Sequence, residues 1–491
     1  MNKEDKIKSL VKRKRTKIER DNSRVICRAH IPGNLLYIGK IIERVVKLSE
    51  DTAKHLLDNV YADFYDRHKD IEKQFNKHFN KVLEYVPPNT KLSKTKKMLI
   101  GAYFTMEYSI ESAALFNPSI IMHPNQKGIL KDELRFIMSF RATGEGHISS
   151  IVFRSGIIKN DGSFLFDPIS EYVETPEILL DTLYNKRLFC CQLKTMKSWD
   201  EISKRIFEYI PNGFTYSELK VSINKLYTDP NFNFNHHQTI NDIIWLANSN
   251  YQIKFNKKSR ISERVIFPVS ENESRGIEDA RFIKFVDDNG EIIYYATYTA
   301  YNGISILPQL LETKDFLSFS IITLNGKTVQ NKGMALFPRK IKGKYVMLSR
   351  LDGENNYIMF SDQLHFWNEA KIIQEPKMPW EFIKIGNCGS PLETSEGWLV
   401  ITHGVGAMRR YSIGAILLDL ENPTKMIARL ETPLLVPNEK EREGYVPNVV
   451  YSCGSIIHHD ELIIPYAMSD ITSGIASVNI KDLLECMQPC K

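Results

Sequence analysis

The feature that most constrains the fold of this chain is a repeated unit of two apolar strands. The second strand of each unit ends on a polar residue, in the runs 133–142, 291–300, 343–350, 397–404 and 461–470. A partner strand with its own polar, Gly or Pro opening precedes each run by 15–25 residues. Consecutive sheet units of this kind are typical of β-propellers. We therefore predict a mainly β fold, a five-bladed β-propeller, with a β-sandwich or a double barrel as the alternative.

One stretch with helical periodicity precedes the predicted strands, and a second interrupts them. Apolar residues recur at spacings of three and four between about 36 and 112, and a second helical stretch runs from about 174 to 250. The domain prediction is an N-terminal helical extension with a basic tail (1–112), a propeller catalytic domain (113–480) that contains a helical insertion (174–250), and a C-terminal helix (481–491).

Charge and composition narrow the classes of partner. Residues 1–20 contain nine Lys or Arg and three acidic residues, a surplus that equals the net charge of +6, and we interpret them as a solvated, frayed terminus. The rest of the chain lacks the basic and aromatic interleaving of a nucleic-acid module, and no run reaches the roughly 18–20 apolar residues of a membrane span. The start of the chain lacks the apolar region of a secretory signal, and the seven irregularly spaced cysteines favour reduced thiols. We expect a cytoplasmic protein without nucleic-acid or membrane partners.

Polar residues at equivalent places in the repeat form the candidate site. In a propeller the ends of the inner strands meet at one mouth, so residues far apart in sequence converge there. The second strands end on Arg141, Thr299, Arg350, His403 and Asp470, and the partner strands open with Asn117, Asp279, Lys332, Asn387 and Asn448. One such residue alone usually marks a strand that has reached solvent, but several at equivalent positions predict a site.

Asp279 is the candidate proton donor. It lies in the segment SRGIEDAR, beside Glu278 and between two arginines. A carboxylic acid that donates a proton near neutral pH needs a raised pKa, from burial or from a like charge such as that of Glu278. In a regular strand, Glu278 and Asp279 would point to opposite faces and could not share one site. A turn-capping Asp in a salt bridge is the structural alternative.

Lys332, Arg350 and His403 form a candidate anion site. Arg presents a planar fork to phosphate oxygens, Lys is a point charge, and a protonated His can donate to an anion. Because the chain has no Gly-rich nucleotide loop, a free phosphate or an anionic substrate is the expected ligand, with scattered ion pairs as the alternative. His458 and His459 fall in a predicted turn without a third ligand at useful spacing, so we expect no metal and no organic cofactor.

At these residues the chain resembles glycoside hydrolase family 130, the β-mannoside phosphorylases and related β-mannosidases. The stretches that carry the resemblance are FNPSIIMHPNQ, SRGIEDARF, NKGMALFPRKIKGKYVMLSR, GNCGSPLETSEGWLVITHGVG and YVPNVVYSCGSIIHHDELIIPYAMSD. The resemblance implies a five-bladed propeller. It also implies that Asp279 is the general acid, acting through a sugar hydroxyl. Arg350 and His403 would bind phosphate, with Lys332 as a further phosphate ligand, and Asn117, Arg141 and Asp470 would hold the non-reducing-end mannose.

The predicted function is an inverting β-mannoside phosphorylase, which converts a β-mannoside and inorganic phosphate into α-mannose 1-phosphate and a shortened acceptor. An inverting hydrolase needs a second carboxylate to activate water, whereas a phosphorylase needs cations for its phosphate. The basic residues favour phosphorolysis, while Glu145 and Glu393 keep a β-mannosidase open. A nucleotide-sugar mannosyltransferase and a non-catalytic glycan-binding propeller are the further alternatives. We expect the helical extension and insertion to influence acceptor choice and homo-oligomerisation.

Overall fold

Five antiparallel sheet units of about four strands each make up most of the molecule. The computed structural model describes residues 7, 9–179, 182–227, 237–304 and 306–490. The first unit consists of β4 (Ala114–Met122), β5 (Leu134–Thr143), β6 (Ser149–Ile158) and β7 (Phe164–Phe166), and the second of β13 (Gly276–Val286), β14 (Ile292–Tyr301), β15 (Ile306–Thr313) and β16 (Ser318–Thr323). A single parallel pair, Ser149 with Gly276, joins these two units into one larger sheet. The third consists of β17 (Ala335–Leu336), β18 (Tyr345–Ser349), β19 (Asn356–Ser361) and β20 (Ala370–Gln374). The prediction of a mainly β fold is confirmed.

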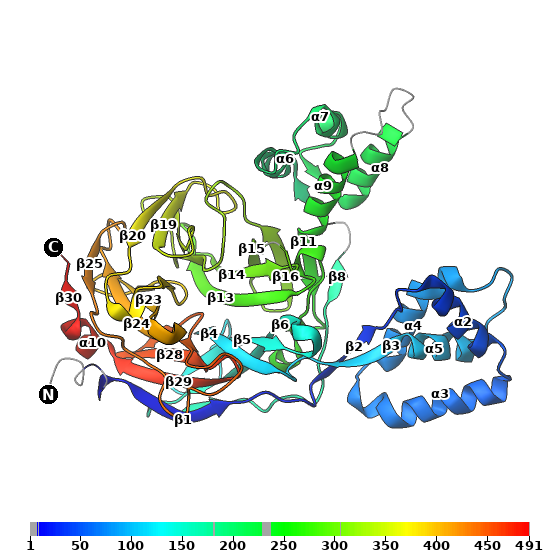
Figure 1. Ribbon diagram of the computed structural model, residues 1–491, viewed down its shortest axis with the longest axis horizontal. Helices are drawn as coiled ribbons and strands as arrows, with labels where there is room; N and C mark the ends of the chain where they lie inside the picture. Colours follow the sequence, from blue (N-terminus) through cyan, green and yellow to red (C-terminus); the bar gives the residue numbers. More distant parts are fainter. Residues whose placement is uncertain (1–6, 8, 180–181, 228–236, 305, 491) are drawn as a thin grey trace.

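The fourth and fifth units each recruit a strand from a chain terminus. The fourth contains β21 (Lys384–Asn387), β22 (Leu392–Glu393), β23 (Trp398–Val405), β24 (Tyr411–Leu418) and β25 (Met426–Arg429), to which β30 (Gln488–Pro489) adds. The fifth contains β26 (Val450–Tyr451), β27 (Ile456–His458), β28 (Glu461–Met468) and β29 (Thr472–Asn479), and β1 (Lys12–Ile18) pairs with β29. Strands β1 and β30 consequently lie in the same part of the molecule in Figure 1.

The expectation of a frayed terminus is therefore wrong for Lys12–Ile18. This segment pairs antiparallel with β29, although most of its side chains are charged and exposed. Lysine-rich strands are common at sheet edges because their charge prevents further pairing. Because the segment has almost no apolar residues, the alternation of apolar and polar residues could not predict this strand.

The sheet units contact one another in chain order. The first contacts the second through β4 and β13, the second contacts the third through β14 and β17, and the third contacts the fourth through β18 and β21. The fourth contacts the fifth through β24 and β26, and the fifth returns to the first through β28 and β4. A parallel bridge between Ser119 and Gly454 joins those first and last units directly.

The N-terminal helices form a group with its own core, separated from the sheet units by the β2–β3 ribbon (Figure 1). They are α2 (Leu35–Val46), α3 (Glu50–Phe64), α4 (Ile71–Val82) and α5 (Lys94–Tyr103), and the ribbon consists of β2 (Val25–Ala29) and β3 (Thr105–Ser109). Asn34, Ser49 and Ser93 cap the first, second and fourth of these helices by accepting backbone N–H bonds. Buried residues such as Ile38, Phe75 and Leu99 belong to one apolar cluster among the helices.

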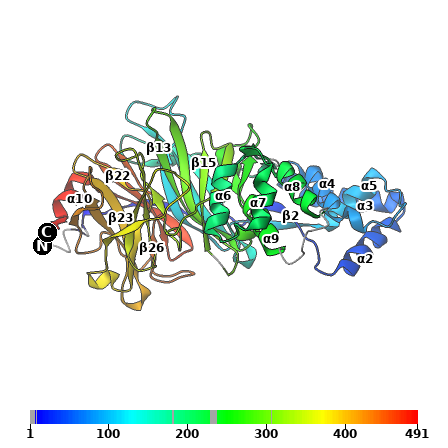
Figure 2. The same ribbon diagram turned by 90° about the horizontal axis from the view of Figure 1, so that it is seen from above.

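The insertion carries a second helical group with a separate core. Its helices are α6 (Lys186–Thr195), α7 (Glu201–Glu208), α8 (Tyr216–Tyr227) and α9 (His237–Asn248), accompanied by β9 (Tyr184–Asn185) and β10 (Gly213–Phe214). Strands β8 (Glu177–Leu179) and β11 (Tyr251–Lys254) connect it to β16, and β12 (Val265–Ile266) pairs with β6. Figure 2 shows both helical groups on the same side of the sheet units, away from α10 (Ile480–Cys486). The exact domain limits stay predictions. None of the helices in the described ranges has the length and apolar character that crossing a membrane requires.

Candidate functional site

Asp279 lies at a bulge in β13. The pairing of β13 with β14 changes register between Glu278 and Arg281, and Asp279 has a φ of 56°. Because the strand is irregular here, the alternation expected of Glu278 and Asp279 does not hold, and Arg141 contacts both carboxylates. The two acids therefore share one site, which a regular strand would have prevented.

Left-handed backbone recurs at four of the predicted site positions. Asn117, Asp279, Asn448 and Asp470 have φ values of 49°, 56°, 62° and 55°. Asn and Asp tolerate this region better than other non-Gly residues, and strained backbone of this kind concentrates at functional sites. Asn117 and Asp279 lie at register shifts inside β4 and β13, and Asn448 and Asp470 lie just outside strands, so none of the four has regular extended backbone.

Residues from the first two sheet units and from the segment before β17 surround the Asp279 carboxylate. Asn117 Nδ2 donates to Asp279 Oδ1 at 2.6 Å, and Arg141 Nη1 lies 3.6 Å from the same oxygen. Arg141 Nη2 donates to Glu278 Oε1 at 2.7 Å, and Lys332 Nζ pairs with the other Glu278 oxygen. We call Asn117, Arg141, Glu278, Asp279 and Lys332 the acid cluster.

The surroundings of Asp279 and Asp470 shift the pKa values of these two carboxyl groups in opposite directions. Burial alone would raise the pKa of Asp279, but Arg141, Lys332 and the hydrogen bond from Asn117 together lower it below the usual value, so Asp279 is ionised. This differs from the raised pKa expected of a proton donor, because the cations outweigh both burial and Glu278. Burial and the nearby charge of Asp279 raise the pKa of Asp470 to about 6, although Arg141 and Arg409 oppose the shift.

Arg350 and His403 form a second pair, supplied by the third and fourth units. Arg350 Nη1 lies 3.3 Å from His403 Nε2. A guanidinium can only donate, so Nε2 accepts, and the ring proton resides on Nδ1, which donates to the Asn387 carbonyl at 3.2 Å. Burial, followed by Arg350 and Arg281, holds the pKa of His403 well below 6.5. In this neutral form His403 Nε2 accepts a hydrogen bond from Arg350, and the role of His403 in phosphate binding stays a prediction.

Arg281 connects the two groups. Its Nη1 donates to the Asn387 carbonyl at 3.0 Å and its Nη2 donates to the Tyr451 hydroxyl at 2.6 Å. Arg281 Nη2 and Arg350 Cβ both lie within 4 Å of the point that a Cβ on Gly333 would occupy. Arg281 is thus close enough to influence the pKa of both Asp279 and His403. The sequence did not predict that Arg281 and Tyr451 contact each other. Arg281 was considered only as a charge beside Asp279, and Tyr451 occupies an ordinary position in a predicted strand.

Two candidate residues form ion pairs with other side chains. Lys332 pairs with Glu278 of the acid cluster, and its role as a phosphate ligand stays a prediction. Glu393, considered as a hydrolytic base, is partly exposed and forms a two-pronged ion pair with Arg339, at 2.6 and 2.9 Å. Glu145 is exposed in a short turn after β5, and Thr299 lines a small pocket with Asp279, Arg281 and Lys332.

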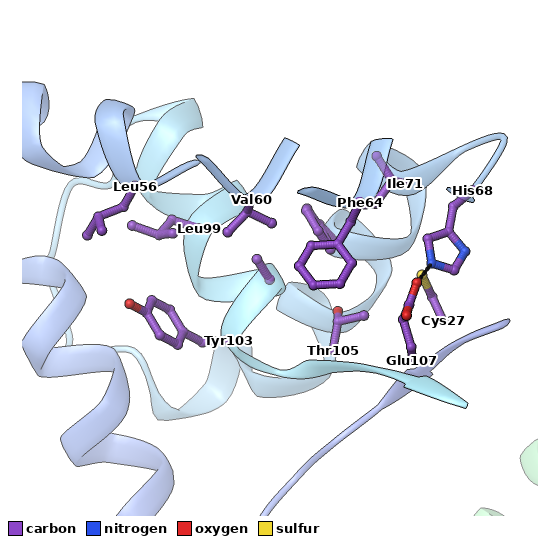
Figure 3. A pocket seen from close by; sticks show the side chains of 12 residues that line it. Cys27, Leu56, Val60, Phe64, His68, Ile71, Leu99, Tyr103, Thr105 and Glu107 are labelled. Atoms are coloured by element: carbon purple, nitrogen blue, oxygen red, sulfur yellow. Dashed lines mark hydrogen bonds and ion pairs between the residues drawn. The ribbon is translucent and has the colours of Figure 1, made fainter. Parts of the chain in front are cut away.

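A separate pocket lies in the helical extension (Figure 3). Apolar side chains such as Leu56, Val60 and Leu99 line most of it, and His68 Nε2 lies 2.8 Å from Glu107 Oε1 at one end. Arg67 also pairs with Glu107. This arrangement satisfies the carboxylate without leaving an acid, base or anion site, so we assign no chemistry to the pocket.

No group of three or more His, Cys, Asp and Glu side chains suited to a metal occurs in the part of the chain that the structure describes. The Nε2 atoms of His458 and His459 each lie 3.1 Å from the Asp132 carbonyl oxygen.

Comparison with protein families identifies the group to which these residues belong. The model of glycoside hydrolase family 130, described as beta-1,4-mannooligosaccharide phosphorylase, matches residues 224–489, more than half of the chain. The chain belongs to this family. The matched region contains Asp279, Arg350, His403 and Asp470, whereas Asn117 and Arg141 lie outside it. Family membership confirms the resemblance seen in the sequence.

Several curated relatives are glycoside phosphorylases. A 1,2-beta-oligomannan phosphorylase of Thermoanaerobacter sp. (strain X514) is 37% identical over 231 residues, which cover 46% of this chain and 75% of the relative. The beta-1,2-mannobiose phosphorylase of Listeria innocua is 30% identical over 230 residues, 45% of this chain and 63% of the relative. The beta-1,4-mannooligosaccharide phosphorylase of Ruminococcus albus is 29% identical over 240 residues, 45% and 70% of the two chains. The predicted enzyme class agrees with these relatives.

Among solved structures, the Listeria innocua beta-1,2-mannobiose phosphorylase in complex with beta-1,2-mannobiose is similar to this chain. The match has a TM-score of 0.44 and 22% identity, and covers 76% of this chain and 92% of that chain.

Proposed function

We propose that this chain is an inverting β-mannoside phosphorylase that transfers a terminal mannosyl group to inorganic phosphate. The observation that carries the proposal is a cation beside the acid cluster. Gly333 lines a small pocket with Asp279 and Lys332, and the point that a Cβ on Gly333 would occupy lies 3.7 Å from Arg350 Cβ. Arg350 has no carboxylate partner in the described part of the chain, and its buried Nε has no hydrogen-bond partner there. A half-buried guanidinium without a carboxylate partner is costly unless an anion neutralises it, and phosphate would do so.

In the proposed reaction, a phosphate oxygen attacks C1 of the mannosyl group from the Arg350 side. The C1–O glycosidic bond breaks, a C1–O–P bond forms with inverted configuration, and the leaving oxygen receives a proton that originates at Asp279. Asp279 is ionised in the protein alone. A phosphate dianion near Arg281 and Arg350 would offset their positive charge and raise the pKa of Asp279 toward that of a donor.

The binding groups follow from the same placement. Asn117, Arg141 and Asp470 would hold hydroxyl groups of the terminal mannose around Asp279, as the family resemblance implies. His403 would act through Arg350, whose guanidinium it orients, and Lys332 would act in the acid cluster. We expect no metal or organic cofactor, because phosphate is itself the nucleophile.

A five-bladed propeller is the architecture we propose for the five sheet units. Their contacts in chain order, together with the bridge from Ser119 to Gly454 between the last unit and the first, support a closed ring. In that arrangement β1 would be the outer strand of the last blade, which ties the blade to the chain terminus. A cytoplasmic location and homo-oligomerisation through the helical groups stay predictions.

The test is a phosphate-dependence assay on β-1,2- and β-1,4-mannobiose. Release of mannose 1-phosphate should require phosphate, and Arg350→Met should raise the KM for phosphate far more than the KM for the disaccharide. Equal sugar release in phosphate-free buffer would reject phosphorolysis. It would favour an inverting β-mannosidase, for which the ionised Asp279 and the higher-pKa Asp470 are a specific carboxylate pair.

A further inference from the structure

Two exposed aromatic rings from opposite ends of the strand region stack on each other. The ring centroids of His147 and Tyr445 are 5.4 Å apart with 30° between the ring planes, and the Tyr445 hydroxyl lies 3.5 Å from His147 Nδ1. Tyr445 is 64% exposed and His147 is also exposed. The chain thus keeps a stacked aromatic surface in water instead of burying it.

This pair lies beside the acid cluster and Asp470. His147 belongs to the turn that follows β5, the strand that carries Arg141. On the other side, the backbone N–H of Val446 donates to the Ser469 carbonyl at 3.1 Å, directly before Asp470. A Cβ on Gly444 would lie 2.5 Å from that same carbonyl oxygen, so the chain passes Ser469 as closely as glycine allows.

The turn that presents His147 is held in a fixed, strained shape. Gly146 and His147 have φ values of 67° and 58°. The buried Tyr108 places its hydroxyl 3.0 Å from the carbonyl oxygens of both Glu145 and Ile148. Strained backbone that neighbouring residues hold in place is common at binding sites. A surface that is already in its binding conformation also loses less conformational entropy when a ligand binds.

We propose that His147 and Tyr445 form the aromatic wall of a carbohydrate subsite, against which the sugar next to the terminal mannose packs its apolar face. This inference rests on the proposed function. An enzyme that removes a terminal sugar holds that sugar against the buried acid cluster, so the next sugar extends toward the exposed side chains. Tyrosine offers a large, rigid surface together with a hydroxyl group, which suits the mixed apolar and polar faces of a pyranose.

The test compares Tyr445→Ala, His147→Ala and a matched control, Tyr209→Ala. Tyr209 is 84% exposed and follows α7 in the insertion, away from the acid cluster. Tyr445→Ala should raise the KM for mannobiose about tenfold, or about 1.4 kcal/mol. His147→Ala should act in the same direction, and the KM for phosphate should stay the same. Tyr445→Phe should retain most of the affinity because the ring remains.

Calorimetric titration with β-1,2- and β-1,4-mannotriose separates this inference from the proposed function. The Kd for the preferred trisaccharide should rise in Tyr445→Ala and His147→Ala but not in Tyr209→Ala, even if no mannose 1-phosphate is ever released. If Tyr445→Ala and Tyr209→Ala had equal Kd values for the trisaccharide and equal KM values for mannobiose, the proposed aromatic wall would be wrong. A selective rise in the KM for phosphate, or a wild-type protein that binds neither trisaccharide, would overturn it as well.

Discussion

Substitution of Gly386 by alanine should damage the phosphate side of the site selectively. Gly386 is buried in β21, directly opposite His403 in the pairing with β23. An added Cβ would lie 2.5 Å from His403 Cε1, 3.0 Å from Nε2 and 3.4 Å from Arg350 Cδ. Carbon atoms pack at about 3.5–4.0 Å, so the imidazole must move by roughly 1 Å, and the guanidinium that it holds moves with it.

The expected magnitude follows from that displacement. Misplacing a substrate-binding group by about 1 Å can cost roughly 10²-fold in rate. Overpacking of a core typically costs about 1–3 kcal/mol of stability. We therefore expect Gly386→Ala to fold with a lower Tm and to show a KM for phosphate that is raised about 10²-fold. The KM for mannobiose should change little, because the acid cluster is untouched.

Steady-state kinetics with each substrate varied in turn provide the assay, and Gly39→Ala is the control. Gly39 lies in α2, where an added Cβ meets no atom within 4 Å. Because alanine loses less backbone entropy than glycine when the helix folds, Gly39→Ala should stabilise the protein by about 0.5–1 kcal/mol without affecting the kinetics. A KM for phosphate within twofold of the wild-type value in Gly386→Ala would refute the assignment of Arg350 and His403 to phosphate.

Three further predictions address the ionisable groups. Asp279→Asn keeps the acceptor for the Asn117 amide, so it should fold normally but lose about 10²–10⁴-fold in kcat/KM; a loss below tenfold would argue against acid catalysis. The same variant removes a charge that raises the pKa of Asp470 to about 6, so the pH midpoint of mannobiose binding, followed by calorimetry from pH 4.5 to 8, should move downward. His403 is neutral in the folded protein and takes up a proton below about pH 6.5 only when unfolded. Its contribution to stability is therefore complete above pH 6.5 and falls as the pH decreases, and Tm measurements on His403→Gln should show a weaker decline than the wild type.

The local pattern of the chain predicted much of the strand region and most of the site. Antiparallel neighbours such as β13 and β14 pair across short turns. Alternating apolar residues and polar strand ends in one short stretch of sequence therefore predict both strands. The edge strand β1 could not be found this way, because its partner β29 lies more than 450 residues away and its side chains are charged. Its position depends on a hydrogen-bonding edge that exists only in the folded sheet.

The amino-acid order alone established which chemical groups are available: a carboxylate in Asp279, a fork-shaped cation in Arg350 and an imidazole in His403. The tertiary structure decided their states. A bulge brings Glu278 and Asp279 to the same arginine, burial beside Arg350 keeps His403 neutral, and Lys332 pairs with the Glu278 carboxylate. Proton positions and ion pairs depend on electrostatic fields from neighbours in other sheet units, and those neighbours become close only when the chain is folded.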